Sequence, residues 1–276
     1  MKHEIRETEQ FGKLLVLNHN GVEMGIALDY GLRIVTFHME GMENIFYEQP
    51  CDLSDNHATD KGWRLRGGHR LWTSPETDLS YYPDNAPITY ELDENTVILT
   101  QEVDPWLNQR KSMTLLFTED GISVTHTVEN TGDEEMTVAP WGVSTMKPGI
   151  IAVPWEGPAP GDFTPRRRVN LWATTSLHDP RLHFDHDAFW AEFMPLADYC
   201  KIGLYAPAGV ATYEGLGQKY TLLFAAPAAE TLPDGGCNFE TYLGKTMMEL
   251  ESLGKVKTLK KGETASHTEL WILEKA

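Results

Sequence analysis

Cysteine is scarce in this 276-residue chain. Cys51, Cys200 and Cys237 are odd in number and far apart, and none belongs to a CxxC pair. This spacing excludes a disulfide framework and argues against a structural zinc site. We interpret all three as reduced thiols, which leads us to expect a cytoplasmic protein.

The chain also lacks positive charge and long apolar runs. Its 41 acidic and 23 basic residues give a formal net charge of −18, which would repel nucleic acid and anionic membrane surfaces. It contains no apolar run long enough to cross a membrane as a helix, and residues 1–15 do not resemble a signal peptide. We therefore expect no nucleic-acid partner, no membrane association and no export.

Strand patterns dominate the sequence. Residues 88–103 alternate apolar and polar side chains around Asp-Glu-Asn, which predicts a hairpin, and residues 111–144 predict a three-stranded meander. Helical periodicity is confined to a turn or two near residues 188–196. The 16 Pro and 23 Gly residues suit many short connections, and no stretch is biased enough to be a linker. The sequence therefore predicts an all-β fold, a large antiparallel β-sandwich that forms a single domain over residues 1–276.

The segment RGGHRLWTSPET, residues 66–77, combines glycines with side chains that can do chemistry. Gly67-Gly68 is too short to cradle a phosphate, so we predict no nucleotide cofactor and no other cofactor. On a strand, Arg70 and Trp72 would share one face, a combination suited to binding a sugar, although a cation–π pair at the surface has the same pattern. Glu76 is a candidate catalytic acid or a solvated loop residue.

Carboxylates cluster near the C-terminus. In MMELES, Glu249 and Glu251 would lie on one face of a strand, about 7 Å apart, and each would raise the pKa of the other. Such a pair suits a general base that works near neutral pH, and a solvent-exposed face is the alternative. Glu240 lies nearby in the sequence as a further candidate.

Three further features of the sequence are explained at least as well without a role in chemistry. His183, Asp185, His186 and Asp187 match no metal-binding motif, so a solvated acidic loop is at least as good an explanation and we predict no metal site. His126 lies in register with Ile122, Val124 and Val128, which indicates a hydrogen-bonded histidine in the core. The run Arg166–Arg168 is either a solvated loop or an attractor for an anionic sugar such as a uronate.

In order along the chain, these segments resemble the galactose mutarotase-like superfamily, which includes the aldose 1-epimerases. The most specific likeness is the Gly-Gly-His-Arg-Leu-Trp…Pro-Glu signature from Gly67 to Glu76, found in uncharacterised bacterial members. VENTGDEEMTVAPWGVSTM, HFDHDAF, FETYLG, MMELESLG and LKKGE resemble further elements of that superfamily in the same order.

The resemblance implies a β-supersandwich whose concave face binds a monosaccharide. Carried over by motif, Arg70 and Asp185 would bind hydroxyls and Glu249 would be the base. The family's acid is a His, but at its position this chain has Trp141, between Pro140 and Gly142, and an indole has no accessible ionisation. His69 or His186 would have to substitute for it, and Trp141 or Trp72 would stack on the sugar.

Three functions follow as alternatives. The first is an aldose 1-epimerase-like isomerase that acts on a monosaccharide or a uronic acid. The second is a glycosidase or lyase that uses Glu249 with Glu240 or Glu76, and the third is a non-catalytic carbohydrate-binding or sensing protein. The fold alone does not choose among them.

Overall fold

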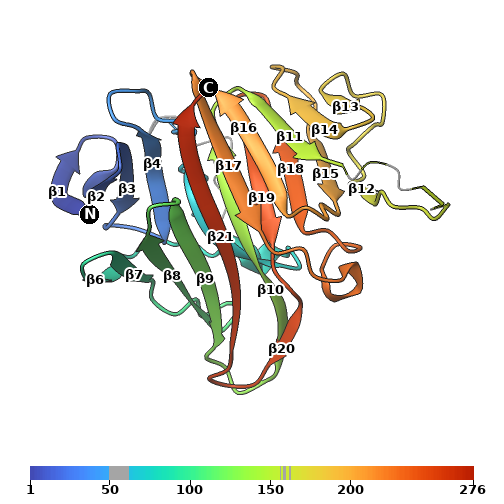
Figure 1. The fold of residues 1–276 in the computed structure, drawn as a ribbon. Coiled ribbons are helices and arrows are strands. Elements are labelled where there is room, and N and C mark those ends of the chain that lie inside the picture. Colours follow the sequence, from blue (N-terminus) through green and yellow to red (C-terminus); the bar gives the residue numbers. More distant parts are fainter. Residues whose placement is uncertain (50–61, 156, 158–159, 162) are drawn as a thin grey trace.

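Two large antiparallel sheets lie face to face in the computed structural model (Figure 1). The structure describes residues 1–49, 62–155, 157, 160–161 and 163–276, so Cys51 lies outside the described residues. Two short 3₁₀ turns, Asp78–Tyr81 and Ala229–Thr231, are the only helical elements in these ranges. No helix in the described part of the chain has the length and apolar character needed to cross a membrane. The predicted all-β sandwich is confirmed.

The first sheet has eleven strands and carries the candidate site. Its strands, in spatial order, are β1 (Lys2–Thr8), β2 (Gly12–His19), β3 (Val22–Ala27), β4 (Arg33–Met39), β5 (Gly68–Ser74), β10 (Met136–Met146), β19 (Met248–Leu253), β18 (Phe239–Leu243), β15 (Cys200–Leu204) and β12 (Val169–Leu171), with β20 (Lys257–Leu259) paired to β10.

The second sheet has ten strands and covers one face of the first. Its strands, in spatial order, are β13 (Leu182–Phe184), β14 (Ala188–Glu192), β11 (Ile150–Pro154), β16 (Val210–Gly215), β17 (Gln218–Phe224), β21 (Thr264–Lys275), β9 (Ile122–Asn130), β8 (Gln109–Phe117), β7 (Thr96–Thr100) and β6 (Thr89–Leu92).

Local patterns predicted most of these strands. The hairpin in residues 88–103 forms as β6 and β7. The three-stranded meander expected over residues 111–144 is wrong in its last strand: β8 pairs with β9, but β10 belongs to the first sheet and pairs with β5, β19 and β20. The helical turn expected near residues 188–196 is wrong, because residues 188–192 form β14, which pairs with β11, and residues 193–196 are not helical. Phe189 and Ala191 are buried whereas Trp190 and Glu192 are exposed, and this period of two is a strand pattern.

The main core lies between the two sheets. Aromatic side chains from both layers meet there: Phe37 of β4 lies 5.4 Å from Tyr220 and 5.2 Å from Trp271, measured between ring centroids. On β9, Ile122, Val124 and Val128 are buried in the same core, in register with His126. Removal of this apolar surface from water drives the two sheets together.

A chain of buried histidines crosses this core. The His126 Nδ1–H donates to the carbonyl of His267 (3.2 Å), so its Nε2 accepts from His69 Nε2 at 2.7 Å. His69 Nδ1 then accepts from the Ser144 hydroxyl at 2.9 Å. Each ring of this pair thus keeps one proton and is neutral, and the prediction that His126 is a hydrogen-bonded core histidine is confirmed.

Burial determines the protonation state of these histidines. It lowers the pKa of His126 and of His267 to about 4, and that of His69 well below its usual value. Burial raises the pKa of the neighbouring Glu269 carboxyl, which accepts hydrogen bonds from Ser252 and from Trp271 Nε1. Adding a proton to any of these rings would place an unsolvated charge between the sheets.

This leads to a pH dependence of stability. A His pKa of about 6.5 in the unfolded chain and about 4 in the folded one means that the unfolded state binds more protons between these values. The free energy of unfolding therefore falls as pH drops from 6.5 towards 4. Glu269 contributes with the opposite sign, because a raised carboxyl pKa costs stability as pH rises above 4.5.

We predict that His126→Gln weakens this dependence. The free energy of unfolding, measured with urea, should decrease from pH 7 to pH 5 in both proteins. The decrease should be smaller in the variant by about 2 kcal/mol, since each unit of pKa shift is worth about 1.4 kcal/mol. The exposed His178→Gln serves as control and should lose as much stability as the wild type. An unchanged pH dependence in His126→Gln would contradict the assignment of a neutral, buried ring.

Candidate functional site

Two glycines bring β5 into close contact with its neighbours. Gly67 and Gly68 have φ of +79° and +71°, which is unfavourable for residues with a side chain. A Cβ at Gly67 would lie 1.9 Å from the Tyr47 carbonyl oxygen, and one at Gly68 would lie 2.3 Å from that of Ile34. The glycines of the signature are therefore required by close backbone packing.

From these glycines onward, β5 alternates between two environments. His69 and Leu71 face the core between the sheets, and Arg70 and Trp72 face the opposite side of the first sheet. There the Arg70 guanidinium carbon lies 4.5 Å from the centroid of the Trp72 ring. A second apolar cluster covers this face and consists of Trp63, Leu65, Trp72, Trp141, Val143, Met247 and Leu253.

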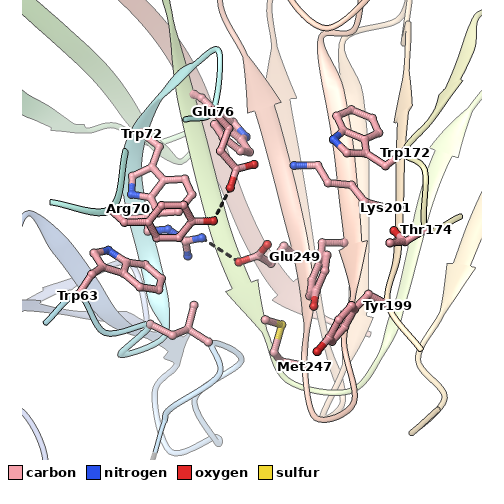
Figure 2. Close-up of a pocket in the computed structure, with 14 residues that line it drawn as sticks. Trp63, Arg70, Trp72, Glu76, Trp172, Thr174, Tyr199, Lys201, Met247 and Glu249 are labelled. Atoms are coloured by element: carbon pink, nitrogen blue, oxygen red, sulfur yellow. Dashed lines mark hydrogen bonds and ion pairs between the residues drawn. The ribbon is translucent and has the colours of Figure 1, made fainter. Parts of the chain in front are cut away.

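A cavity of about 510 Å³ opens above this cluster (Figure 2). This volume lies within the range of small-molecule sites. The lining residues come from β5, β10, β19, β18 and β15, from segments next to these strands, and from the segment that follows β12: Trp63, Leu65, Arg70, Trp72, Glu76, Tyr81, Trp141, Trp172, Thr174, Tyr199, Lys201, Tyr242, Met247 and Glu249.

Glu249 lies on the floor of this cavity and is held from one side. Its Oε1 accepts hydrogen bonds from Arg70 Nη2 at 3.0 Å and from the Thr145 hydroxyl at 3.3 Å. Arg70 also donates to Thr145 Oγ1, so the three side chains are mutually bonded. A carboxylate paired with a guanidinium in a nearly buried position is ionised and held in one orientation, as a base requires.

Lys201 of β15 enters the cavity from the other side. Its ammonium lies 2.9 Å from Glu240 and 3.2 Å from Glu251, and its side chain is only 11% exposed. The same ammonium lies 4.3 Å from the ring centroid of Trp141 and 5.0 Å from that of Trp172. A buried cation thus stands across the cavity from Glu249, as Figure 2 shows.

Two carboxylates share this single ammonium. Burial raises the pKa of Glu240 to about 8 and that of Glu251 to about 7, although Lys201 lowers both. Burial also lowers the pKa of Lys201, but the two carboxylates more than offset this and raise it overall. Because Glu251 accepts a further hydrogen bond from Trp141 Nε1 at 2.8 Å, we assign the negative charge to Glu251 and the retained proton to Glu240.

Glu76 reaches the rim of the cavity. Its carboxylate accepts a hydrogen bond from the Tyr81 hydroxyl, and Figure 2 shows it directed over the cavity above Glu249. Burial, followed by Glu76 itself, raises the pKa of Tyr81 well above its usual value, so this hydroxyl stays protonated.

Trp141 forms part of the cavity floor, but little of its ring is free. It is 3% exposed, with Trp72 packed edge-on against it and the Lys201 ammonium over its ring. Its Nε1–H is used by Glu251. The solvent-accessible aromatic surface of the cavity belongs instead to Tyr81, Trp172, Tyr199 and Tyr242.

Four residues predicted from the sequence do not line the cavity. His69 faces the core because it alternates with Arg70, and Glu240 lies under the floor behind Lys201. Asp185 and His186 lie exposed between β13 and β14 of the second sheet, where their carbonyls accept hydrogen bonds from Arg167. The expected convergence of Arg70, Trp72, Trp141 and Glu249 is found, but Asp185 does not join them.

Among the described residues, one group of side chains could hold a metal ion. The ligand atoms of His69, His126 and Glu269 lie within 4.8 Å of one another, between the sheets. The hydrogen bonds described above already occupy these atoms. Asp185, His186 and Asp187 are exposed and form no such group.

The sequence patterns did not predict Lys201, Trp172, Tyr199 and Tyr242 as residues of the site. One signal was available for Lys201, because it is the only charged residue in the apolar strand CKIGL and must lie on the face opposite Cys200 and Ile202. Trp172 and Tyr199 lie in connecting segments without periodicity, so only the chain's path brings them to the cavity.

Solved structures with the same architecture as this chain are known, although their sequences differ widely from it. No protein-family profile matches the chain, and no curated protein matches it in sequence. Among solved structures, a candidate aldose 1-epimerase of Escherichia coli K12 is 14% identical with a TM-score of 0.56, and covers 95% of this chain and 99% of its own. A galactose mutarotase-like protein of Lactobacillus casei is 10% identical with a TM-score of 0.57, over 95% of this chain and 100% of its own.

A galactose mutarotase-like protein of Clostridium acetobutylicum is 13% identical with a TM-score of 0.53, over 100% of this chain and 98% of its own. Identities this low establish the fold alone. Over nearly its whole length, the chain has the β-supersandwich fold of the galactose mutarotase-like and aldose 1-epimerase proteins.

Proposed function

We propose that the chain binds a sugar in the cavity above Glu249 and acts on it as an aldose 1-epimerase-like isomerase. The observation that carries this proposal is the position of the Glu249 carboxylate, fixed by Arg70, across the cavity from the Lys201 ammonium. The mutarotase-like fold supports a carbohydrate ligand, which we take to be a monosaccharide or a uronic acid.

The chemistry needs one proton acceptor and one donor. Glu249 takes the proton of the anomeric hydroxyl, the bond between C1 and the ring oxygen breaks, and C1 becomes a carbonyl. The ring oxygen takes a proton from the Lys201 ammonium, and the C1–C2 bond rotates. In the reverse steps the ring oxygen returns its proton to Lys201, the anomeric oxygen takes the proton back from Glu249, and the ring closes in the other anomeric form. Arg70 holds Glu249 and donates to a hydroxyl of the sugar.

Lys201 serves as the proton donor in place of the acid His that the family has at the position of Trp141. Its ammonium donates a hydrogen bond to the ring oxygen and stabilises the negative charge that develops there. Because its pKa is raised, it releases a proton less readily than an imidazolium does. The catalysis of plain glucose or galactose mutarotation is therefore weak.

One observation favours a second function, a glycosidase. Glu76 and Glu249 both face the cavity, and hydrolysis of a glycosidic bond uses two carboxyl groups on either side of it. Release of a monosaccharide from a glycoside would identify this activity, whereas an isomerase only interconverts anomers.

We predict that sugars raise the melting temperature of the protein. Binding to the native state alone stabilises by mass action, about 2.7 kcal/mol at a ligand concentration of 100 times Kd. A panel of neutral sugars and uronic acids should contain compounds that raise it, and sugar alcohols of the same size serve as controls. If no sugar shifts the melting temperature at concentrations up to 100 mM, the proposed function is wrong.

Glu249→Gln tests the base. Anomer exchange followed by NMR should fall to the uncatalysed rate, since loss of a general base typically costs 10²- to 10⁴-fold. Glu274→Gln, in an exposed pair with Lys219, is the matched control and should retain the wild-type rate. Circular dichroism at the assay temperature shows whether each variant is folded, and catalysis by a folded Glu249→Gln would exclude Glu249 as the base.

Lys201→Met tests the shared ammonium. Without it, the buried side chains of Glu240 and Glu251 lose the ammonium that both contact, and breaking such a buried pair costs about 3–5 kcal/mol. Burial keeps the pKa of both carboxyls above that of the unfolded chain, so the loss should be larger at pH 8 than at pH 5.

Lys201→Met/Glu240→Gln should recover part of the stability at pH 8, because one of the two carboxylates is gone. Lys219→Met, which removes a lysine from an exposed pair, should change the free energy of unfolding by no more than about 0.5 kcal/mol. Equal losses in Lys201→Met and Lys219→Met would contradict the role of Lys201.

A further inference from the structure

We propose that the outer face of the second sheet is an interface at which two copies of this chain associate as a symmetric dimer. The strands that form this face lie side by side in Figure 1. The cavity above Glu249 belongs to the first sheet, so the inference is independent of the proposed function.

The register of the second sheet places four rows of side chains next to one another on its outer face. Along each strand these side chains alternate with residues of the core. The first row crosses from β14 to β21 and consists of Trp190, Ala152, Thr212, Thr221 and Ile272. The second crosses from β16 to β7 and consists of Val210, Leu223, Leu270, Ser123, Leu116 and Thr96. The third and fourth cross from β21 to β7 and consist of Thr268, Thr125, Thr114 and Ile98, and of Ser266, Thr127, Ser112 and Thr100.

None of the side chains in these four rows, all of which lie in the described part of the chain, is charged. Charged residues make up 23% of the sequence and lie mostly on protein surfaces, so composition alone would place about four on a patch of this size. Charge returns only at the two ends of the rows, as the pairs Arg110–Glu129 (3.2 Å) and Lys219–Glu274 (3.9 Å). An uncharged centre with a polar rim is typical of a protein–protein interface.

The patch combines an aliphatic stripe with hydroxyls that bond to one another. Four of the six side chains in the second row are aliphatic, and Leu116 among them is 44% exposed. In the rows beside it, Thr125 and Thr268 are joined by a hydrogen bond of 3.0 Å between their hydroxyls, and Thr127 and Ser266 by one of 3.1 Å. Burying the aliphatic groups is favourable, and hydroxyls that already have a partner lose less when water leaves.

The area of the patch is sufficient for a dimer. Strands about 4.8 Å apart with a two-residue repeat of about 6.8 Å give each outward residue about 33 Å² of the face. Four rows of four to six residues thus cover roughly 600 Å² on one copy and 1,200 Å² on two, the lower end for a specific interface. We therefore expect a dissociation constant on the order of micromolar.

The charge of the chain favours a second copy as the occupant of this face. Two copies, each with a formal charge of −18, repel one another wherever their carboxylates meet, but their uncharged faces can touch without opposing charges. A two-fold axis places the same patch on both sides of the contact, so an uncharged patch is complementary to itself. A basic partner would be drawn instead to the acidic surfaces elsewhere on the molecule.

Analytical ultracentrifugation tests this inference. Between about 1 and 100 µM protein, the mass should rise from 31.1 kDa towards twice that value. Association should strengthen between 50 and 500 mM NaCl, because salt screens the repulsion between the two acidic copies. A protein that stays monomeric at 100 µM in both salt concentrations, or a dimer that weakens as salt is added, would overturn the uncharged interface.

Lysine substitutions locate the interface. Leu116→Lys and Thr268→Lys each place an ammonium in the patch at an exposed position, and both should weaken association at least tenfold because that charge loses its water. Ile5→Lys adds the same charge at a 51% exposed aliphatic position on β1 of the first sheet and should associate as the wild type does. Circular dichroism shows whether each variant is folded. Dimerisation that both patch variants leave unchanged, or that Ile5→Lys weakens as much as they do, would contradict the proposal.

Discussion

The site depends on two carboxylates that lie on one face of a buried strand. β19 is the central strand of the region, and its alternation sends Met248 and Leu250 into the core and Glu249 and Glu251 to the opposite face. A buried carboxylate is stable only when it is paired or keeps its proton. These carboxylates therefore require cations on either side of the strand. Arg70 of β5 and Lys201 of β15, each two strands away from β19, supply them.

The two pairs are not equivalent, and the difference gives the site its chemistry. Arg70 holds one carboxylate, so Glu249 is ionised and open to the cavity. Lys201 contacts two carboxyl groups, Glu240 and Glu251, so one of them, Glu240, keeps its proton beneath the cavity floor. The ammonium itself lies at the cavity. A base and a cation thus face each other across a cavity with an indole floor, so that groups of both signs are in place where charge develops on a bound sugar.

Local sequence patterns predicted the strands and the side chains that each strand presents. Period-two alternation placed Arg70 with Trp72 and Glu249 with Glu251, and the sandwich followed from hairpin turns and short connections. These local patterns could not predict that β15 lies beside β18 and that β18 lies beside β19, because such pairings depend on the path of the whole chain. Lys201 was missed for that reason. The motif HFDHDAF misled in the opposite way: its order along the chain suggested the cavity, but β13 and β14 belong to the second sheet.

The position of a bound sugar tests the central claim most directly. A crystal structure of the protein with the sugar that raises its melting temperature most should show a ring between Arg70 and Lys201, with an anomeric oxygen within hydrogen-bond distance of a Glu249 carboxylate oxygen. A sugar bound at another surface, with the cavity above Glu249 filled only by water, would contradict the account.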